Sequence, residues 1–167
     1  MMRSLIGAAV AGVTLALGAA ALAQGTSFAL GDARHDATAP VELSSDRLTV
    51  DQSTGETVFT GNAVIAQGGL RLSAETIRIV FAEDSGTGAR RIDQLSASGG
   101  VTLVTDDEAA ESRTAEYRVP QGLIIMTGDV LLTQGNNVIS GDRLEVDLNN
   151  GQGTMEGRVR TIFQPGR

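Results

Sequence analysis

The sequence predicts an all-β domain, and three features support this prediction. Apolar and polar residues alternate in short runs after residue 40. Glycine and asparagine, which favour turns, separate these runs at short intervals. No stretch after residue 40 keeps the 3.6-residue apolar period of an amphipathic helix. Because period-two alternation is typical of strands that bury one face, we expect antiparallel sheet rather than helix.

The chain begins with a segment typical of an export signal. Arg3 is its only charged residue, and it precedes an apolar stretch, Ser4 to Leu22, that leads into the small-x-small pattern ending at Ala23. We expect residues 1–23 to be a signal peptide, cleaved between Ala23 and Gln24. A retained membrane anchor is the alternative, because the stretch is long enough to span a bilayer, although its Ala and Gly content makes it weakly hydrophobic.

Residues 24–40 are small and polar and predict a flexible lead-in, so that residues 41–167 form one domain of ordinary size. The alternation in that domain is clearest at Val41 to Leu43, Leu48 to Val50, Ile77 to Phe81 and Leu144 to Leu148. Between Val58 and Ala66, apolar residues occupy both even-numbered and odd-numbered positions, so neither face is clearly the buried one. This mixture predicts a bulge near Gly61-Asn62.

Turn signals separate these strands. Their glycines and asparagines adopt the positive φ that tight hairpins need. They occur at Ser53-Thr54-Gly55, Gln67-Gly68-Gly69, Ser85-Gly86-Thr87-Gly88, Gln121-Gly122, Gly135-Asn136-Asn137 and Asn149-Asn150-Gly151. Pro120 interrupts a strand-like run and predicts an edge or turn. Ala82 to Arg91 and Thr105 to Ser112 are interpreted as longer loops.

An internal repeat narrows the choice among β architectures. The hexamer Asp46 to Asp51 recurs at Asp142 to Asp147, 96 residues later, and Gly61 falls on Gly157 at the same offset. A second offset of 67 places Gln67 on Gln134, together with several glycines. Four units of about 23 to 39 residues, each a strand, a turn and a strand, would stack their apolar faces into one continuous core.

Composition excludes several classes of function. Asp and Glu number 20 against 13 Lys and Arg, giving a net charge of −7, whereas nucleic-acid binding rests on clustered basic residues. There is no Cys, so neither a disulfide nor a thiolate site is expected. His35 is the only histidine and lies in the polar lead-in. We therefore expect no enzyme, no catalytic residue, no metal and no cofactor. The acidic run Asp106-Asp107-Glu108 is interpreted as a solvated loop.

Several motifs in order carry a family resemblance over roughly residues 40 to 164. They are Val41 to Asp46, Val58 to Val64, Gln67-Gly68, Leu70 to Glu75, Ala115-Glu116-Tyr117, Met126 to Val130, Ile139 to Arg143 and Gly157 to Thr161. With these motifs behind an export signal, the chain resembles the periplasmic lipopolysaccharide-transport protein family (LptA, with its OstA-like domain).

The resemblance implies a folded-over antiparallel β jelly roll with an apolar lumen that binds lipopolysaccharide. It also implies a periplasmic location and a bridge between an inner-membrane-anchored transport partner and the outer-membrane lipopolysaccharide translocon. Members of the family stack end to end, so head-to-tail self-association is expected as well. The alternatives are a structural β-solenoid scaffold with a dry core, and a membrane-anchored relative of the same transport system.

Alternation and the resemblance together select the lumen candidates. They are Val41, Leu43, Leu48, Val50, Ile77, Ile79, Leu103, Tyr117, Val119, Leu144 and Val146. Tyr117, the only tyrosine, occupies a position where the family has an aromatic residue in the lumen. The two terminal strands are expected to be edges for partner docking through Val41, Glu42, Leu43, Val159, Thr161 and Phe163, because unpaired strand edges can accept a partner's strand.

Overall fold

The computed structural model describes residues 25–29, 39–83 and 86–163. In these residues the fold is one antiparallel sheet, and the only helical element is the short 3₁₀ helix η1, Val119–Gln121. The strands are β1 Thr26–Ala29, β2 Glu42–Ser44, β3 Arg47–Val50, β4 Thr57–Gln67, β5 Leu70–Glu83, β6 Arg90–Val104, β7 Glu108–Arg118, β8 Leu123–Gln134, β9 Asn137–Asp147, β10 Gln152–Glu156 and β11 Arg160–Ile162. The all-β jelly-roll prediction is confirmed.

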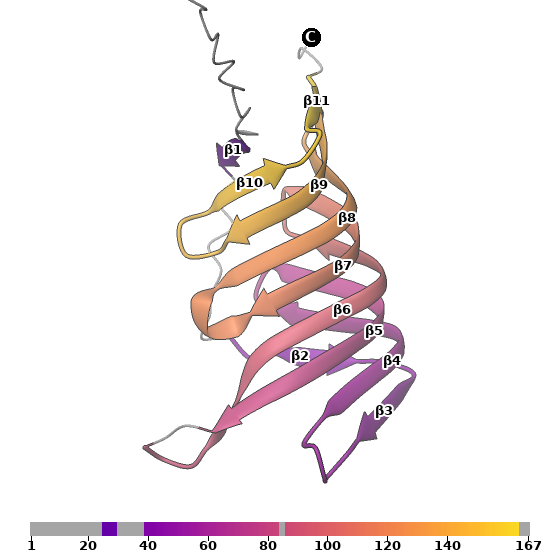
Figure 1. Cartoon of the computed structure of the whole chain (residues 1–167), viewed down its shortest axis with the longest axis vertical. Coiled ribbons are helices and arrows are strands. Elements are labelled where there is room, and N and C mark those ends of the chain that lie inside the picture. The colour runs from indigo at the N-terminus through magenta and orange to yellow at the C-terminus, as the bar shows by residue number, and fades with distance from the viewer. Residues whose placement is uncertain (1–24, 30–38, 84–85, 164–167) are drawn as a thin grey trace, which may run out of the picture.

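The strands stack along the long axis of the molecule (Figure 1). Their order is β1-β10-β9-β8-β7-β6-β5-β4-β2, with β3 also on β4 and β11 also on β9. β2 and β3 therefore lie at one end, whereas β10, β1 and β11 lie at the other (Figure 1). Consecutive strands pair as hairpins from β4 to β10, so the chain climbs the stack one strand at a time.

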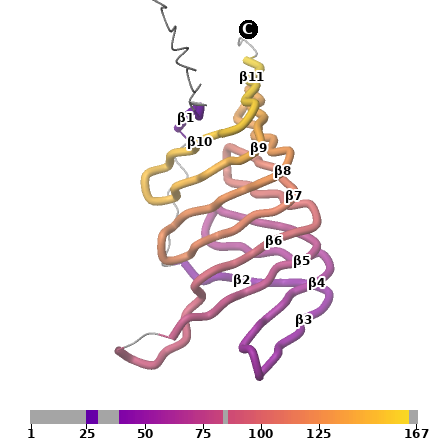
Figure 2. The backbone as a smooth tube through the Cα atoms, in the orientation of Figure 1, coloured from indigo at the N-terminus to yellow at the C-terminus, as the bar shows by residue number. Residues whose placement is uncertain are grey.

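Each long strand bends once and contributes to two half-sheets, as the folded tube of Figure 2 shows. The first half-sheet comprises β2, residues 63–67, 70–74, 101–104, 108–112, 130–134 and 137–141, and β11. The second comprises β3, residues 57–60, 76–83, 90–98, 114–118, 123–127 and 143–147, β10 and β1. The side where the strands bend is called the fold line below, and the opposite side, where the hairpin turns meet, is called the mouth.

Paired residues with positive φ lie at the bends of β4, β6 and β8. Gly61-Asn62 have φ of 80° and 46°, and the β4–β5 register shifts between Thr60 and Ala63. The bulge predicted there is confirmed. Equivalent pairs are Gly99-Gly100 in β6, Gly128-Asp129 in β8 and Gly157-Arg158 after β10. Glycine supplies this backbone conformation without the steric cost that a Cβ brings.

The sequence repeat has a structural counterpart at the fold line. The backbone N–H of Asp46 donates to the carbonyl of Gly61 at 2.9 Å, and that of Asp142 donates to Gly157 at 3.1 Å. Both pairs are separated by the same repeat offset. The recurring hexamer therefore marks a recurring bend, in which the backbone N–H of an aspartate donates to the carbonyl of a glycine 15 residues later.

The structure differs from the expected elements at three places. The predicted loop Thr105 to Ser112 is wrong, because β7 begins at Glu108 after a tight turn closed by Thr105 N–H and Glu108 C=O at 2.9 Å. The loop expected at Ala82 to Arg91 is narrower, since Ala82 pairs with Arg91 and Glu83 with Arg90. Pro120 lies in the η1 turn, as predicted.

The third difference is β1, a strand within the expected lead-in, which pairs with β10. The expected signal peptide with its cleavage site, and His35, lie outside the described residues. Within the described part of the chain, no helix has the length and apolar character needed to cross a membrane.

Candidate functional site

Three rows of inward-facing side chains cross the molecule from end to end. Residues opposite each other in paired antiparallel strands share a face, so the register defines each row. The first half-sheet carries Leu43, Ile65, Leu72, Leu103, Ala110, Leu132, Ile139 and Thr161. The second carries Leu48, Phe59, Ile77, Ala97, Ala115, Met126, Leu144 and Met155 in one row, and Val50, Thr57, Ile79, Leu95, Tyr117, Ile124, Val146, Gly153 and Phe28 in the next.

Most predicted lumen residues lie in these rows and are buried between the half-sheets. The buried ones, at no more than 5% exposure, are Ile77, Ile79, Leu103, Tyr117, Leu144 and Val146. Val41, Leu43 and Val119 are partly buried against the same core. The apolar interior is therefore one continuous layer that runs the length of the stack.

Leu48 and Val50 differ from these buried residues. They face inward by register, as expected of lumen candidates, but they are 55% and 56% exposed, so nothing among the described residues encloses them. β3 is the last strand of its half-sheet, and among the described residues it pairs only with β4. Alternation predicts which face a residue occupies, but it does not predict whether anything covers that face. The interior is consequently open at the β3 end.

A small cavity of about 30 Å³ remains between the half-sheets at the mouth. It is lined by Leu70, Leu103, Thr105, Glu108, Ala110 and Leu132 from the first half-sheet and its turns, and by Leu144, Val146, Asp147, Leu148 and Gly151 from the second. This volume is about the share of one water molecule in liquid water. Side chains thus fill the interior in this state, and a larger guest must separate the half-sheets.

Tyr117 bridges the two half-sheets near the mouth. Its hydroxyl donates to Oε1 of Gln67 at 3.3 Å, and both residues are buried. Burial raises the pKa of Tyr117 above its ordinary value of 10.0, so the phenol stays neutral and able to donate. Nε2 of Gln67 also donates to the carbonyl of Ala39 at 3.1 Å. One amide therefore connects β4, β7 and the start of the domain.

Gln134 makes the corresponding contacts at the other end, although sequence reasoning gave it no role. Its Nε2 donates to the carbonyl of Ala29 at 2.9 Å and to the carboxylate of Glu108 at 2.6 Å. Gln67 and Gln134 are equivalent at the offset of 67 residues, and each holds a carbonyl of the N-terminal segment. The repeat was the sequence signal available for both residues, because a glutamine at equivalent hairpin ends indicates a shared structural role.

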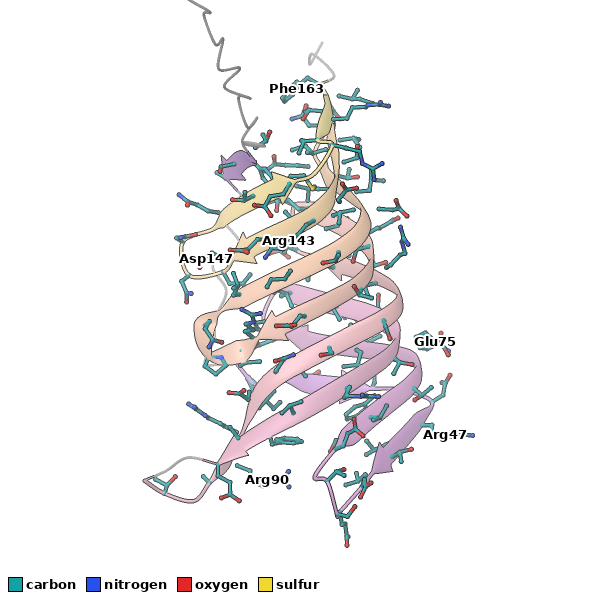
Figure 3. All side chains as sticks on the ribbon, in the orientation of Figure 1. Arg47, Glu75, Arg90, Arg143, Asp147 and Phe163 are labelled. Atoms are coloured by element: carbon teal, nitrogen blue, oxygen red, sulfur yellow. The ribbon has the colours of Figure 1, made fainter. Side chains whose placement is uncertain are left out.

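The outer surface carries charged side chains, some of which form ion pairs. Nε of Arg78 contacts the carboxylate of Glu56 at 2.8 Å, and Arg143 contacts Glu145 and Glu156 at 2.6 and 2.8 Å. Figure 3 shows Glu75 and Arg47 projecting outward along the fold line. The molecule therefore separates an apolar interior from a hydrophilic exterior. No group of three His, Cys, Asp or Glu residues suited to a metal occurs among the described residues.

The residues expected at docking edges lie at opposite ends of the stack. Glu42 and Leu43 are in β2, with Val41 just before it, and β2 pairs with β4. Thr161 is in β11, between Val159 and Phe163, and β11 pairs with β9. Phe163, at 72% exposure, lies at the end opposite β3 (Figure 3). Two further strands end the second half-sheet. The sequence predicts β3 as a strand but not its place at an end, and it does not predict β1.

Comparison with known proteins identifies relatives of this chain. It is 28% identical over 165 residues to an uncharacterized protein of Rhizobium meliloti, covering 94% of this chain and 89% of that one. It is 23% identical over 112 residues to the lipopolysaccharide export system protein LptA of Escherichia coli K12, covering 65% of this chain and 60% of that protein.

A solved structure shares the fold. The crystal structure of LptH, the LptA-homologous periplasmic component of the lipopolysaccharide transport device of Pseudomonas aeruginosa, superposes with a TM-score of 0.67. The sequences are 18% identical, and the match covers 78% of this chain and 99% of LptH. The sequence model of the family described as LptA/(LptD N-terminal domain) LPS transport protein matches residues 42–152, about two thirds of the sequence. The chain therefore belongs to the LptA/LptD N-terminal-domain family of lipopolysaccharide transport proteins.

Proposed function

We propose that this protein is exported to the periplasm, with residues 1–23 removed, and carries lipopolysaccharide there. The acyl chains lie between the half-sheets and the sugars remain outside. The observation that supports this most directly is the set of three mainly apolar rows, two of which end at the exposed Leu48 and Val50. Relatives named for lipopolysaccharide export and transport support the choice of lipid.

The physical need for such a trough is large. A 12-carbon acyl chain exposed to water costs about 9 kcal/mol, at about 0.8 kcal/mol per CH₂. Continuous apolar rows lower that cost at every step along the molecule. Because the free cavity is only about 30 Å³, acyl chains enter by parting the half-sheets at the mouth, where side-chain hydrogen bonds such as Tyr117–Gln67 connect them.

The proposal includes a bridge between membranes. At one end β2, with Val41, Glu42 and Leu43, accepts a strand of a homologous domain, and at the other end the segment Val159, Thr161 and Phe163 does the same. One neighbour is the inner-membrane-anchored transport partner and the other is the outer-membrane translocon. Strand addition suits these ends because their backbone groups continue the ladder and the rows continue the apolar surface.

Photo-crosslinking in the native host tests the lipid site. A photoreactive residue replaces Tyr117, and outward positions Glu42 and Glu145 serve as controls. We expect a lipopolysaccharide adduct at Tyr117 and none at the controls, because only Tyr117 lies in a buried row.

A second candidate function is a dry structural scaffold, which the nearly filled interior favours. A folded, exported variant that gives no adduct at Tyr117 would support the scaffold and reject lipid transport. Equal adducts at Tyr117 and at both controls would place the lipid on the outer surface and reject the trough.

A further inference from the structure

β1 occupies the edge where the stack would otherwise continue. It pairs with β10 on the side opposite β9, in the register Thr26–Met155, Ser27–Thr154, Phe28–Gly153 and Ala29–Gln152. The ring of Phe28 covers Gly153, where an added Cβ would lie 2.5 Å from the ring. The chain's own N-terminal strand therefore closes the last edge of the second half-sheet.

The contacts that hold β1 are few. Three of its four residues are exposed and only Phe28 is partly buried. Within the described part of the chain, β1 is held by its ladder to β10, by the Phe28 ring over Gly153, by the Gln134 amide on the carbonyl of Ala29 at 2.9 Å and by the Ser27–Thr154 hydroxyl pair at 3.5 Å. A four-residue strand with one apolar anchor is among the least stable parts of a fold and opens before the core does.

β3 at the opposite end has the features of a replacement for β1. Both strands have four residues, and both run antiparallel to an even-numbered strand, β4 or β10, so they share one direction in the stack. In both strands every second residue faces inward. These residues are Leu48 and Val50 in β3, and Thr26 and Phe28 in β1. Leu48 and Val50 are more than half exposed, so they gain burial from a covering strand, whereas Thr26 contributes little.

We propose that β1 is an internal stand-in strand, which closes the β10 edge until β3 of a second copy of this chain displaces it. β2 of the second copy first pairs with β11 of the first copy. Among the described residues, β11 pairs only with β9, so its other edge is available. β3 then exchanges with β1, placing Leu48 opposite Met155 and Val50 opposite Gly153. All three rows then continue into the second copy. This inference rests on the end-to-end docking of the proposed function and adds its regulation.

A reversible lock tests the exchange. The chain has no cysteine, so Ser27→Cys with Thr154→Cys introduces one possible disulfide, between residues that already lie opposite each other. Intact mass confirms the intramolecular bond in the purified exported chain. Sedimentation velocity over a concentration series then measures self-association of the oxidised form, the reduced form and a Phe28→Ala variant.

We expect oxidation to raise the dissociation constant at least about tenfold and reduction to restore the wild-type value, because a locked edge cannot accept a strand. Phe28→Ala loosens β1 and lowers the dissociation constant relative to wild type. Equal association of the oxidised and reduced forms overturns the proposal, and so does a chain that stays monomeric in every form. The lipid adduct at Tyr117, measured separately, distinguishes either result from a failure of lipid carriage.

Discussion

At the scale of single residues, the fold line carries charge pairs with a defined pH response. Arg158 donates to both carboxylate oxygens of Asp142, with Nη2–Oδ1 at 2.7 Å and Nε–Oδ2 at 3.2 Å. This hydrogen bonding holds the pKa of Asp142 below its ordinary value of 3.8. A lowered acid pKa means that the pair stabilises the folded chain at neutral pH. The contribution is lost as the pH falls below the ordinary value and through the folded one.

Arg158→Gln should therefore raise the pKa of Asp142 toward 3.8, as an NMR titration of its carboxyl carbon would show. Any stability difference from wild type should be present at neutral pH and disappear in acid. Asp51 is the internal control, because the hydroxyl and amide of Ser53 in its own turn lower its pKa. An unchanged titration of Asp142 in the variant would show that Arg158 does not set its pKa.

At the scale of one strand, the bulge in β6 offers a matched test of how the bends are built. Gly99 and Gly100 have φ of 87° and 82°, so alanine is unfavourable at either position. A Cβ at Gly99 would lie 2.6 Å from the Cβ of Glu75, whereas one at Gly100 would meet nothing within 4 Å. The two adjacent sites therefore separate backbone strain from crowding.

We expect Gly100→Ala to lower the free energy of unfolding by about 1–2 kcal/mol, the cost of a left-handed residue. Gly99→Ala should cost about 1–3 kcal/mol more, because Glu75 must move. Urea denaturation of the two variants measures the difference. If both variants lost the same free energy of unfolding, Glu75 would move away from the new Cβ at no cost. The close approach of Gly99 and Glu75 at the fold line would then not contribute to stability.

The same strands show which structural features the sequence pattern predicts and which it does not. Alternation placed Ile77 and Ile79 correctly on a buried face, and mixed parity around Gly61-Asn62 located a bulge. The Gly99-Gly100 bulge was not predicted, since the two glycines equally suit an ordinary turn. β1 was missed because Thr26–Ala29 has little alternation and its partner β10 is more than 120 residues away. Long-range pairing and cover depend on neighbours that no local pattern identifies, as the exposure of Leu48 also shows.

At the scale of the whole molecule, some exposed apolar residues face the interior between the half-sheets and others lie on the outer surface. Leu48 faces the interior side at the β3 end and is 55% exposed, whereas Val80 is 47% exposed and pairs with Gln94 on the outer face of β5. Leu48→Glu and Val80→Glu are therefore a matched pair. Each should change the stability of the isolated chain by less than about 1 kcal/mol.

Only Leu48→Glu should abolish end-to-end association, because its carboxylate would interrupt a row that, in the proposed docking, continues into the neighbouring domain. Capture of homologous domains by the immobilised variants, under one set of conditions, measures this. Comparable capture by both variants would exclude the β3 end as a docking surface. If only Val80→Glu abolished capture, the docking surface would instead be the outer face of β5.

The alternation of strand directions also sets how the length of such a molecule can change. Neighbouring strands in a sheet lie about 4.8 Å apart, so each strand-turn-strand unit adds about 10 Å to the stack. Adding one unit keeps the direction of both end strands and the inward face of every row. Adding a single strand would reverse one end and prevent it from fitting its neighbour. The length of a stack that keeps both its ends can therefore change only by pairs of strands, in steps of about 10 Å.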